Sequence, residues 1–209
     1  MSQNLRRSFF LFGGLLTLAA GAPSIAAEKA VDCCREEKPA TPLTRGSIYQ
    51  LEAAFTDDTG ESRSLESLRG QSVVLNLFYA SCGYACPIAV SDMLALQARV
   101  PANLRSRTVF VLVSFDTTHD TTAVLAEYRK QRGLDAQWIL LRGTDDSVRE
   151  LAALVGVKYK PEPGGAFAHS NLITILNPEG EIVHQRIGLN GGLAEAAAAL
   201  GAPQRHEIQ

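Results

Sequence analysis

The sequence predicts one α/β domain with a central mixed sheet flanked by helices. Two continuous apolar runs, residues 73–79 and 108–115, have the character of strands that are buried on both faces of a sheet. Segments with helical character, residues 87–100 and 121–132, follow these two strands. Strands that alternate with helices in this way indicate an α/β fold.

The other expected elements continue this alternation. They are strands at residues 48–55, 137–141, 171–176 and 181–186, and helices at residues 145–155 and 193–200. Asn177-Pro178-Glu179-Gly180 joins the last two strands, and proline second with glycine fourth fits a type I turn. A chain of 209 residues that is 46% hydrophobic is large enough for one such domain and too small for two.

The first 27 residues have the order of a secretory signal. Arg6 and Arg7 precede an apolar run at residues 9–22, and the small residues around 24–27 offer a cleavage site. The arginine pair also resembles a twin-arginine signal. Because a spanning helix needs about 20 apolar residues, the short run favours cleavage over an uncleaved anchor. We therefore expect export to the periplasm, with attachment to the inner membrane through the N-terminus as the alternative.

Three segments follow residues 1–27. Residues 28–45 are rich in charge and proline and are expected to be a flexible linker. Residues 46–201 are expected to form the folded domain, and residues 202–209 a tail. A net charge of −2 gives no sign of the concentrated basic face of a nucleic-acid-binding protein.

Four cysteines occur in two close groups. Cys33 and Cys34 are adjacent in the expected linker, while Cys82 and Cys86 are separated by three residues and followed by Pro87. The second pair lies where a buried strand feeds a helix, with the proline expected to open that helix. This placement favours a thioredoxin-like fold.

The position and spacing of Cys82 and Cys86 favour metal binding without excluding redox exchange. The unpaired N–H groups and the dipole of a helix N-terminus favour the thiolate form. Redox sites of the thioredoxin type usually have two residues between the cysteines, and the wider spacing here leaves room for a metal or a disulfide. Two thiolates form a soft site that selects Cu(I).

A third ligand is expected to be an imidazole, and His169 is the best candidate. It follows the Gly-Pro-rich segment 161–165 and precedes the strand expected at 171–176. In a thioredoxin-like fold the loop that enters this strand approaches the cysteine loop. The other histidines are His119 in an exposed loop, His184 in a strand and His206 in the tail. Asp116, at the end of a strand, is predicted either to orient the site or to cap the strand.

Motifs along residues 44–188 carry a family resemblance. They are Thr44-Arg45-Gly46, Leu68-Arg69-Gly70, Phe78-Tyr79, Cys82-x-x-x-Cys86-Pro87, Val113-Ser114-Phe115-Asp116, Asp120-Thr121, His169-Ser170 and Asn177-Pro178-Glu179-Gly180. Together they resemble the Sco/SenC family of copper chaperones.

The resemblance implies a thioredoxin-like fold and copper, as Cu(I) or also Cu(II), bound by Cys82, Cys86 and His169. It further implies delivery of copper to, or reduction of the cysteines of, the copper centre of a respiratory oxidase such as cytochrome c oxidase. Three departures leave the client open to a related cuproenzyme: Gly83-Tyr84-Ala85 replaces the usual Pro-Asp-Val, Asp116-Thr117 replaces Asp-Pro, and Ser81 stands where His or Phe is frequent.

The alternative function is that of a periplasmic thiol–disulfide oxidoreductase that uses Cys82 and Cys86 without metal, with a thiol reductase as a further partner. A metallochaperone is favoured over an enzyme. Zinc is less favoured because its structural sites usually have four ligands. A peroxidase is disfavoured because no Thr or Ser and Arg support a peroxidatic cysteine around Cys82.

Overall fold

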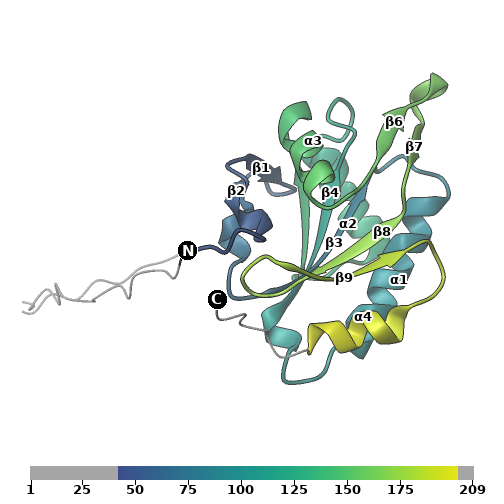
Figure 1. Ribbon diagram of the computed structural model, residues 1–209. Helices are drawn as coiled ribbons and strands as arrows, with labels where there is room; N and C mark the ends of the chain where they lie inside the picture. Colours follow the sequence, from purple (N-terminus) through teal and green to yellow (C-terminus); the bar gives the residue numbers. More distant parts are fainter. Residues whose placement is uncertain (1–41, 202–209) are drawn as a thin grey trace, which may run out of the picture. The chain divides into compact units, whose positions relative to one another are not determined.

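A seven-stranded mixed sheet organises residues 42–201, the part of the chain that the computed structural model describes (Figure 1). The strand order is β2-β1-β5-β4-β3-β8-β9. The strands are β1 (Ala54–Asp57), β2 (Ser62–Ser64), β3 (Ser72–Phe78), β4 (Thr108–Ser114), β5 (Trp138–Arg142), β8 (Leu172–Leu176) and β9 (Ile182–Ile187). The central β3, β4 and β5 are parallel, and both flanks of the sheet are antiparallel.

Helices cover both faces of the sheet. They are α1 (Ala85–Arg99), α2 (Thr122–Arg132), α3 (Asp145–Leu154) and α4 (Leu193–Leu200). The right-handed crossovers β3-α1-β4 and β4-α2-β5 step in the same direction along the sheet, so α1 and α2 lie on one face. α4 packs against α1 on that face, and α3 lies over the other (Figure 1). The predicted thioredoxin-like arrangement, a mixed sheet flanked by helices, is confirmed.

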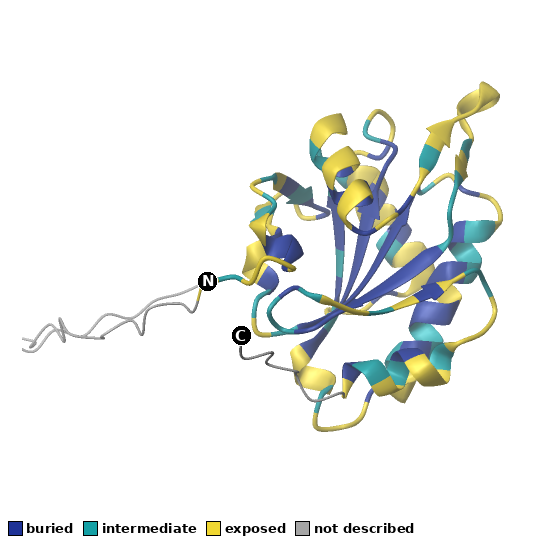
Figure 2. Ribbon diagram, viewed as in Figure 1, coloured by how far each residue is buried: buried dark blue, intermediate teal, exposed yellow. Residues whose placement is uncertain are grey.

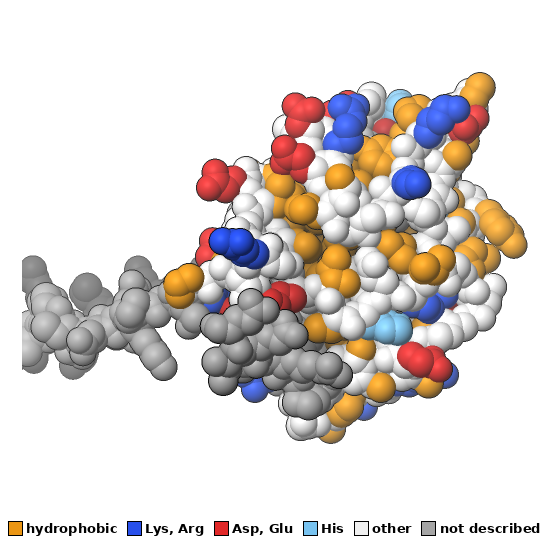
Figure 3. Space-filling model, viewed as in Figure 1, with side chains coloured by type: hydrophobic (Ala, Val, Ile, Leu, Met, Phe, Trp, Pro, Cys, Tyr) orange, Lys and Arg blue, Asp and Glu red, His pale blue; other side chains and the backbone are white. Residues whose placement is uncertain are grey.

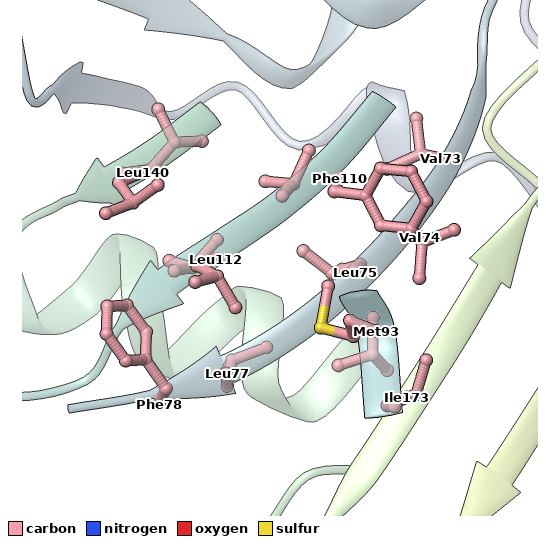
Figure 4. Packing of buried hydrophobic residues seen from close by; sticks show 14 of the residues in the cluster. Val73, Val74, Leu75, Leu77, Phe78, Met93, Phe110, Leu112, Leu140 and Ile173 are labelled. Atoms are coloured by element: carbon pink, nitrogen blue, oxygen red, sulfur yellow. The ribbon is translucent and has the colours of Figure 1, made fainter. Parts of the chain in front are cut away.

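The core lies along β3 and its two neighbours. Every residue of β3 is buried, as its apolar run predicts. Figure 4 shows the side chains of this core, with Met93 of α1 packed beside β3 and Ile173 of β8 nearby. The strands at the centre are mostly dark blue in Figure 2, while the outer helix faces are largely exposed.

Local capping explains where the helices begin and end. The hydroxyl of Thr121 accepts a hydrogen bond from the N–H of Val124 at the start of α2, and Gly133 ends that helix at a φ of 63°. Thr144 caps α3 in the same way, and two aspartates occupy its first turn. Leu125 and Tyr128 are the buried residues of α2, while Val124 is 39% exposed.

One predicted strand is wrong and several short elements were missed. Residues 48–55 do not form a strand: Ile48–Gln50 is a 3₁₀ helix, and the strand begins only at Ala54. The side chain of Ser47 accepts a hydrogen bond from the N–H of Tyr49, which stabilises the helical turn. The missed elements are β2, the two-stranded hairpin of β6 (Tyr159–Pro161) and β7 (Phe167–His169), and the 3₁₀ helices Leu65–Leu68, Arg105–Arg107 and Pro163–Gly165.

Sheet topology brings distant segments to one edge. β3 and β4 are parallel and in register from Ser72↔Thr108 to Phe78↔Ser114, so their carboxyl ends meet. β8 is antiparallel to β3, so the chain enters β8 at this same edge. The Asn76 side chain donates to the carbonyl of Leu172 at 2.9 Å and fixes that entry point.

Several predictions fall outside the described residues. These are the signal segment, the linker cysteines Cys33 and Cys34, and the tail with His206. Within residues 42–201, no helix has the length and apolar character needed to cross a membrane. Basic and acidic side chains are interspersed on the face shown in Figure 3.

Candidate metal centre

Cys82 and Cys86 lie at the junction between β3 and α1. Cys82 is in the loop that follows β3, where its N–H donates to the carbonyl of Tyr79 at 3.2 Å. α1 begins at Ala85 rather than at Pro87, so Cys86 lies within the first turn and Tyr84 is the N-cap. Pro87 fits in this first turn because the first N–H groups of a helix have no partner within the helix. The predicted location of the two thiols, where a buried strand feeds a helix, is correct.

His169 reaches the cysteines from a segment that the sequence did not identify as a strand. It is the last residue of β7 and pairs with Tyr159 of β6. The chain then passes through Ser170 into β8, which enters the sheet beside the carboxyl end of β3. The predicted approach of this histidine to the cysteine loop is therefore present in the structure.

The three side chains form one cluster. The sulfurs of Cys82 and Cys86 and a ring nitrogen of His169 all lie within 4.8 Å of one another. The distance from Cys86 Sγ to His169 Nε2 is 3.9 Å. His169 Nδ1 lies 3.3 Å from the carbonyl oxygen of Ser170, which assigns the ring proton to Nδ1 and leaves the Nε2 lone pair for the sulfurs. Two sulfurs and one imidazole nitrogen are a donor set that fits a soft cation.

The two thiols differ in their electrostatic surroundings. Burial raises the pKa of the Cys82 thiol, but the N–H groups of Cys86 and Tyr84 lower it. The side chains of Cys86 and His169 lower it further, so that the pKa of Cys82 is about 7. The N–H of Cys86 donates to Cys82 Sγ at 3.3 Å. Burial raises the pKa of Cys86 well above its ordinary value, which makes Cys82 the nucleophile of the pair.

This difference predicts selective alkylation of Cys82. In reduced protein, iodoacetamide should modify Cys82 faster than Cys86, and the rate should rise with pH through about 7 as the Cys82 thiol becomes a thiolate. Tandem mass spectrometry of the peptide that contains both residues measures each site separately. Faster modification of Cys86 would contradict the assignment.

A buried carboxylate, Asp120, supports the cysteine loop. Its Oδ2 accepts the N–H of Ala80 at 2.9 Å and also the hydroxyl of Ser114. Burial raises the pKa of Asp120, while these hydrogen bonds lower it. Asp120 belongs to a motif quoted above, but the sequence assigned it no role. Its contact with Ala80 fixes the backbone two residues before Cys82.

Asp116 makes different contacts from those of Asp120. It is buried, and its side-chain oxygens accept from the N–H and Nδ1 of His119, at 3.1 Å and at 2.9 and 3.0 Å. The side chain of His119 is 72% exposed, as expected. A role for Asp116 in orienting the metal ligands stays a prediction, since the hydrogen bonds of its side chain within residues 42–201 go to His119.

Comparisons with known proteins agree with this fold. A protein of Stutzerimonas stutzeri that is named for copper binding is 28% identical over 184 residues, which cover 86% of each chain. The crystal structure of Arabidopsis thaliana ScoI with copper bound is similar with a TM-score of 0.63 at 20% identity, over 71% of this chain and 92% of that one. BsSco, described as a member of the Sco family of cytochrome c oxidase assembly proteins, has a TM-score of 0.63 at 20% identity, over 72% and 91% of the two chains.

The family model of SCO1/SenC matches residues 44–200. This match spans nearly all of the described domain and includes both cysteines and the histidine. The chain therefore belongs to the SCO1/SenC family.

Proposed function

We propose that this protein is a copper-binding assembly factor whose metal site is formed by Cys82, Cys86 and His169. It delivers copper to, or reduces the cysteines of, the copper centre of a respiratory oxidase or a related cuproenzyme. The observation that carries the proposal is the convergence of the three ligand atoms within 4.8 Å of one another. Family membership and the copper-bound relative support it.

The donor set suits a cargo of Cu(I). Thiolate sulfur is a soft ligand, and Cu(I) is the soft ion among the common biological metals. Both cysteines are largely buried, at 9% exposure for Cys82 and 1% for Cys86, so the site can shield the ion from water. Thiolates of a client can reach Cys82 more easily than Cys86, and we propose that ligand exchange begins there.

The same thiols can also reduce a client. The Cys82 thiolate attacks one sulfur of a client disulfide and forms a mixed disulfide, and one client thiolate leaves. Cys86 then attacks Cys82, which forms the Cys82–Cys86 disulfide and releases the second client thiol. Two electrons pass to the client, and a separate thiol reductase must restore the dithiol.

We place this activity in the periplasm. The arginine pair, the apolar run and the small residues of the first 27 positions support export. A respiratory oxidase as client is supported by the description of BsSco as a cytochrome c oxidase assembly protein.

Metal analysis of reduced protein tests the proposal. Protein loaded with Cu(I) without oxygen and then desalted should retain one copper per chain. The double variant Cys82→Ser/Cys86→Ser should retain almost none, because serine oxygen is a poor ligand for a soft ion. The matched control is Cys33→Ser/Cys34→Ser, which should still retain one copper. Retention that depends on Cys33 and Cys34 instead would contradict the proposal.

A further inference from the structure

The hairpin β6–β7, which carries His169, is separate from the main sheet. Its strands pair only with each other among the described strands, from Tyr159↔His169 to Pro161↔Phe167. Its other bonds from backbone to backbone are also internal: the N–H of Glu162 donates to the carbonyl of Ala166, and that of Ser170 to the carbonyl of Lys158. Figure 2 shows the hairpin extending from the body of the domain with its tip exposed. Side chains must therefore fix its position against the cysteine loop.

Four aromatic rings join the hairpin to the main sheet. Tyr79 and Phe115 directly follow the carboxyl ends of β3 and β4, and Tyr159 and Phe167 belong to β6 and β7. The ring of Phe167 lies 5.1 Å from that of Tyr79 and 5.1 Å from that of Phe115, between centroids. The rings of Phe115 and Tyr159 are stacked at 4.9 Å and 15°. These distances are those of favourable aromatic pairs, and we call the four residues the ring cluster.

The ring cluster also contacts the metal ligands. The imidazole of His169 lies 5.3 Å from the Phe115 ring and 6.0 Å from the Tyr79 ring, edge-on to the latter at 89°. The Tyr79 phenol interacts with the Cys82 side chain and with the backbone N–H of Phe167. The ring cluster therefore links the hairpin to the cysteine loop.

We propose that the ring cluster is the positioning device of the third copper ligand. Phe167 and Phe115 hold the imidazole of His169 within reach of the two sulfurs, although neither residue donates a ligand atom. The copper affinity of the site therefore depends on aromatic packing as well as on the ligands. This inference rests on the proposed function, since it concerns the same Cys82, Cys86 and His169 centre.

Phe167 is the best residue at which to test this role. It is only partly buried and packs at the margin of the core, outside the main sheet, so the fold should tolerate loss of its ring. Phe167→Ala should lower the Cu(I) affinity of the reduced full-length protein by roughly 10–100-fold, the usual effect of losing a group that orients a metal ligand. Competition with the Cu(I) chelator bicinchoninate measures this loss. Phe167→Tyr keeps a ring and should restore most of the affinity, and Lys160→Ala, on the exposed part of the same hairpin, should leave it unchanged.

A double variant separates positioning from general damage. If Phe167 acts through His169, then Phe167→Ala/His169→Ala should bind Cu(I) as weakly as His169→Ala alone, and no more weakly. Wild-type affinity in Phe167→Ala would overturn the inference. An equal fold-loss on adding Phe167→Ala to the His169→Ala variant would overturn it too. If His169→Ala alone bound Cu(I) normally, the proposed ligand set itself would fail, which is a distinct result.

Discussion

Replacement of His169 by alanine should lower the Cu(I) affinity of the reduced protein by roughly 100-fold or more. Changes in groups that only orient a ligand usually cost about 10–100-fold, and loss of the ligand itself should exceed that. The variant should fold normally because His169 is only partly buried and lies at the end of a three-residue strand outside the main sheet. Anaerobic competition titrations of the wild type and the variant measure the change.

Two further measurements make this test specific. His184→Ala removes a partly exposed imidazole from β9 and should leave the affinity unchanged. Added imidazole should restore part of the affinity of the His169→Ala variant, because a free ring can occupy the space of the missing one. Equal losses in the two histidine variants would show that His169 has no special place in the site.

The second large effect concerns stability rather than copper. Asp92 of α1 and Arg186 of β9 form a buried ion pair with an Oδ2–Nη2 distance of 2.7 Å. Asp92 also accepts the N–H of Asn190 at 3.0 Å. Asp92→Ala should lower the free energy of unfolding by about 3–5 kcal/mol, because it leaves the guanidinium buried without its counter-charge. Urea unfolding of the metal-free, reduced protein measures this loss.

Two control variants show whether the loss of stability comes from a buried charge left unpaired or from the loss of the ion pair itself. Asp92→Leu/Arg186→Met removes both charges and should be much closer to the wild type than Asp92→Ala. Arg149→Ala breaks only exposed pairs with Asp145 and Asp146 and should cost about 1 kcal/mol or less. A cost for Asp92→Ala as small as that for Arg149→Ala would show that this pair does not stabilise the fold.

The sequence was sufficient to predict the strands and helices that a short stretch of residues indicates by itself. The apolar runs of β3 and β4 indicate strands buried on both faces, and their bounds differ from the prediction by one residue at each end or less. The same holds for α2, where a capping threonine and Gly133 mark both ends. The location of the two thiols followed from this strand–helix junction.

The hairpin that carries His169 could not be read from the sequence. β6 and β7 have three residues each, too few to show a period, and Pro161 lies within one of them. Gly164 and Gly165 adopt positive φ of 81° and 79° in the turn, so the segment reads as an irregular loop. His169 was nevertheless found, because the predicted fold brings the entry to β8 near the cysteines.

The role of Asp120 was missed for a different reason. Its motif was quoted, but its partner, the N–H of Ala80, lies 40 residues away in the sequence. Only the parallel pairing of β3 and β4 brings the two together. The aromatic contacts of Phe115 and Phe167 also depend on tertiary structure and leave no periodic signal in the chain.

X-ray absorption at the copper edge most directly tests the central claim, that three side chains from two distant segments bind one ion. The Cu(I)-loaded Cys33→Ser/Cys34→Ser variant, which leaves Cys82 and Cys86 as its cysteines, should show two sulfur ligands and one imidazole nitrogen. The nitrogen should disappear from the spectrum on His169→Ala. A spectrum with sulfur ligands alone, unchanged by that substitution, would contradict the account.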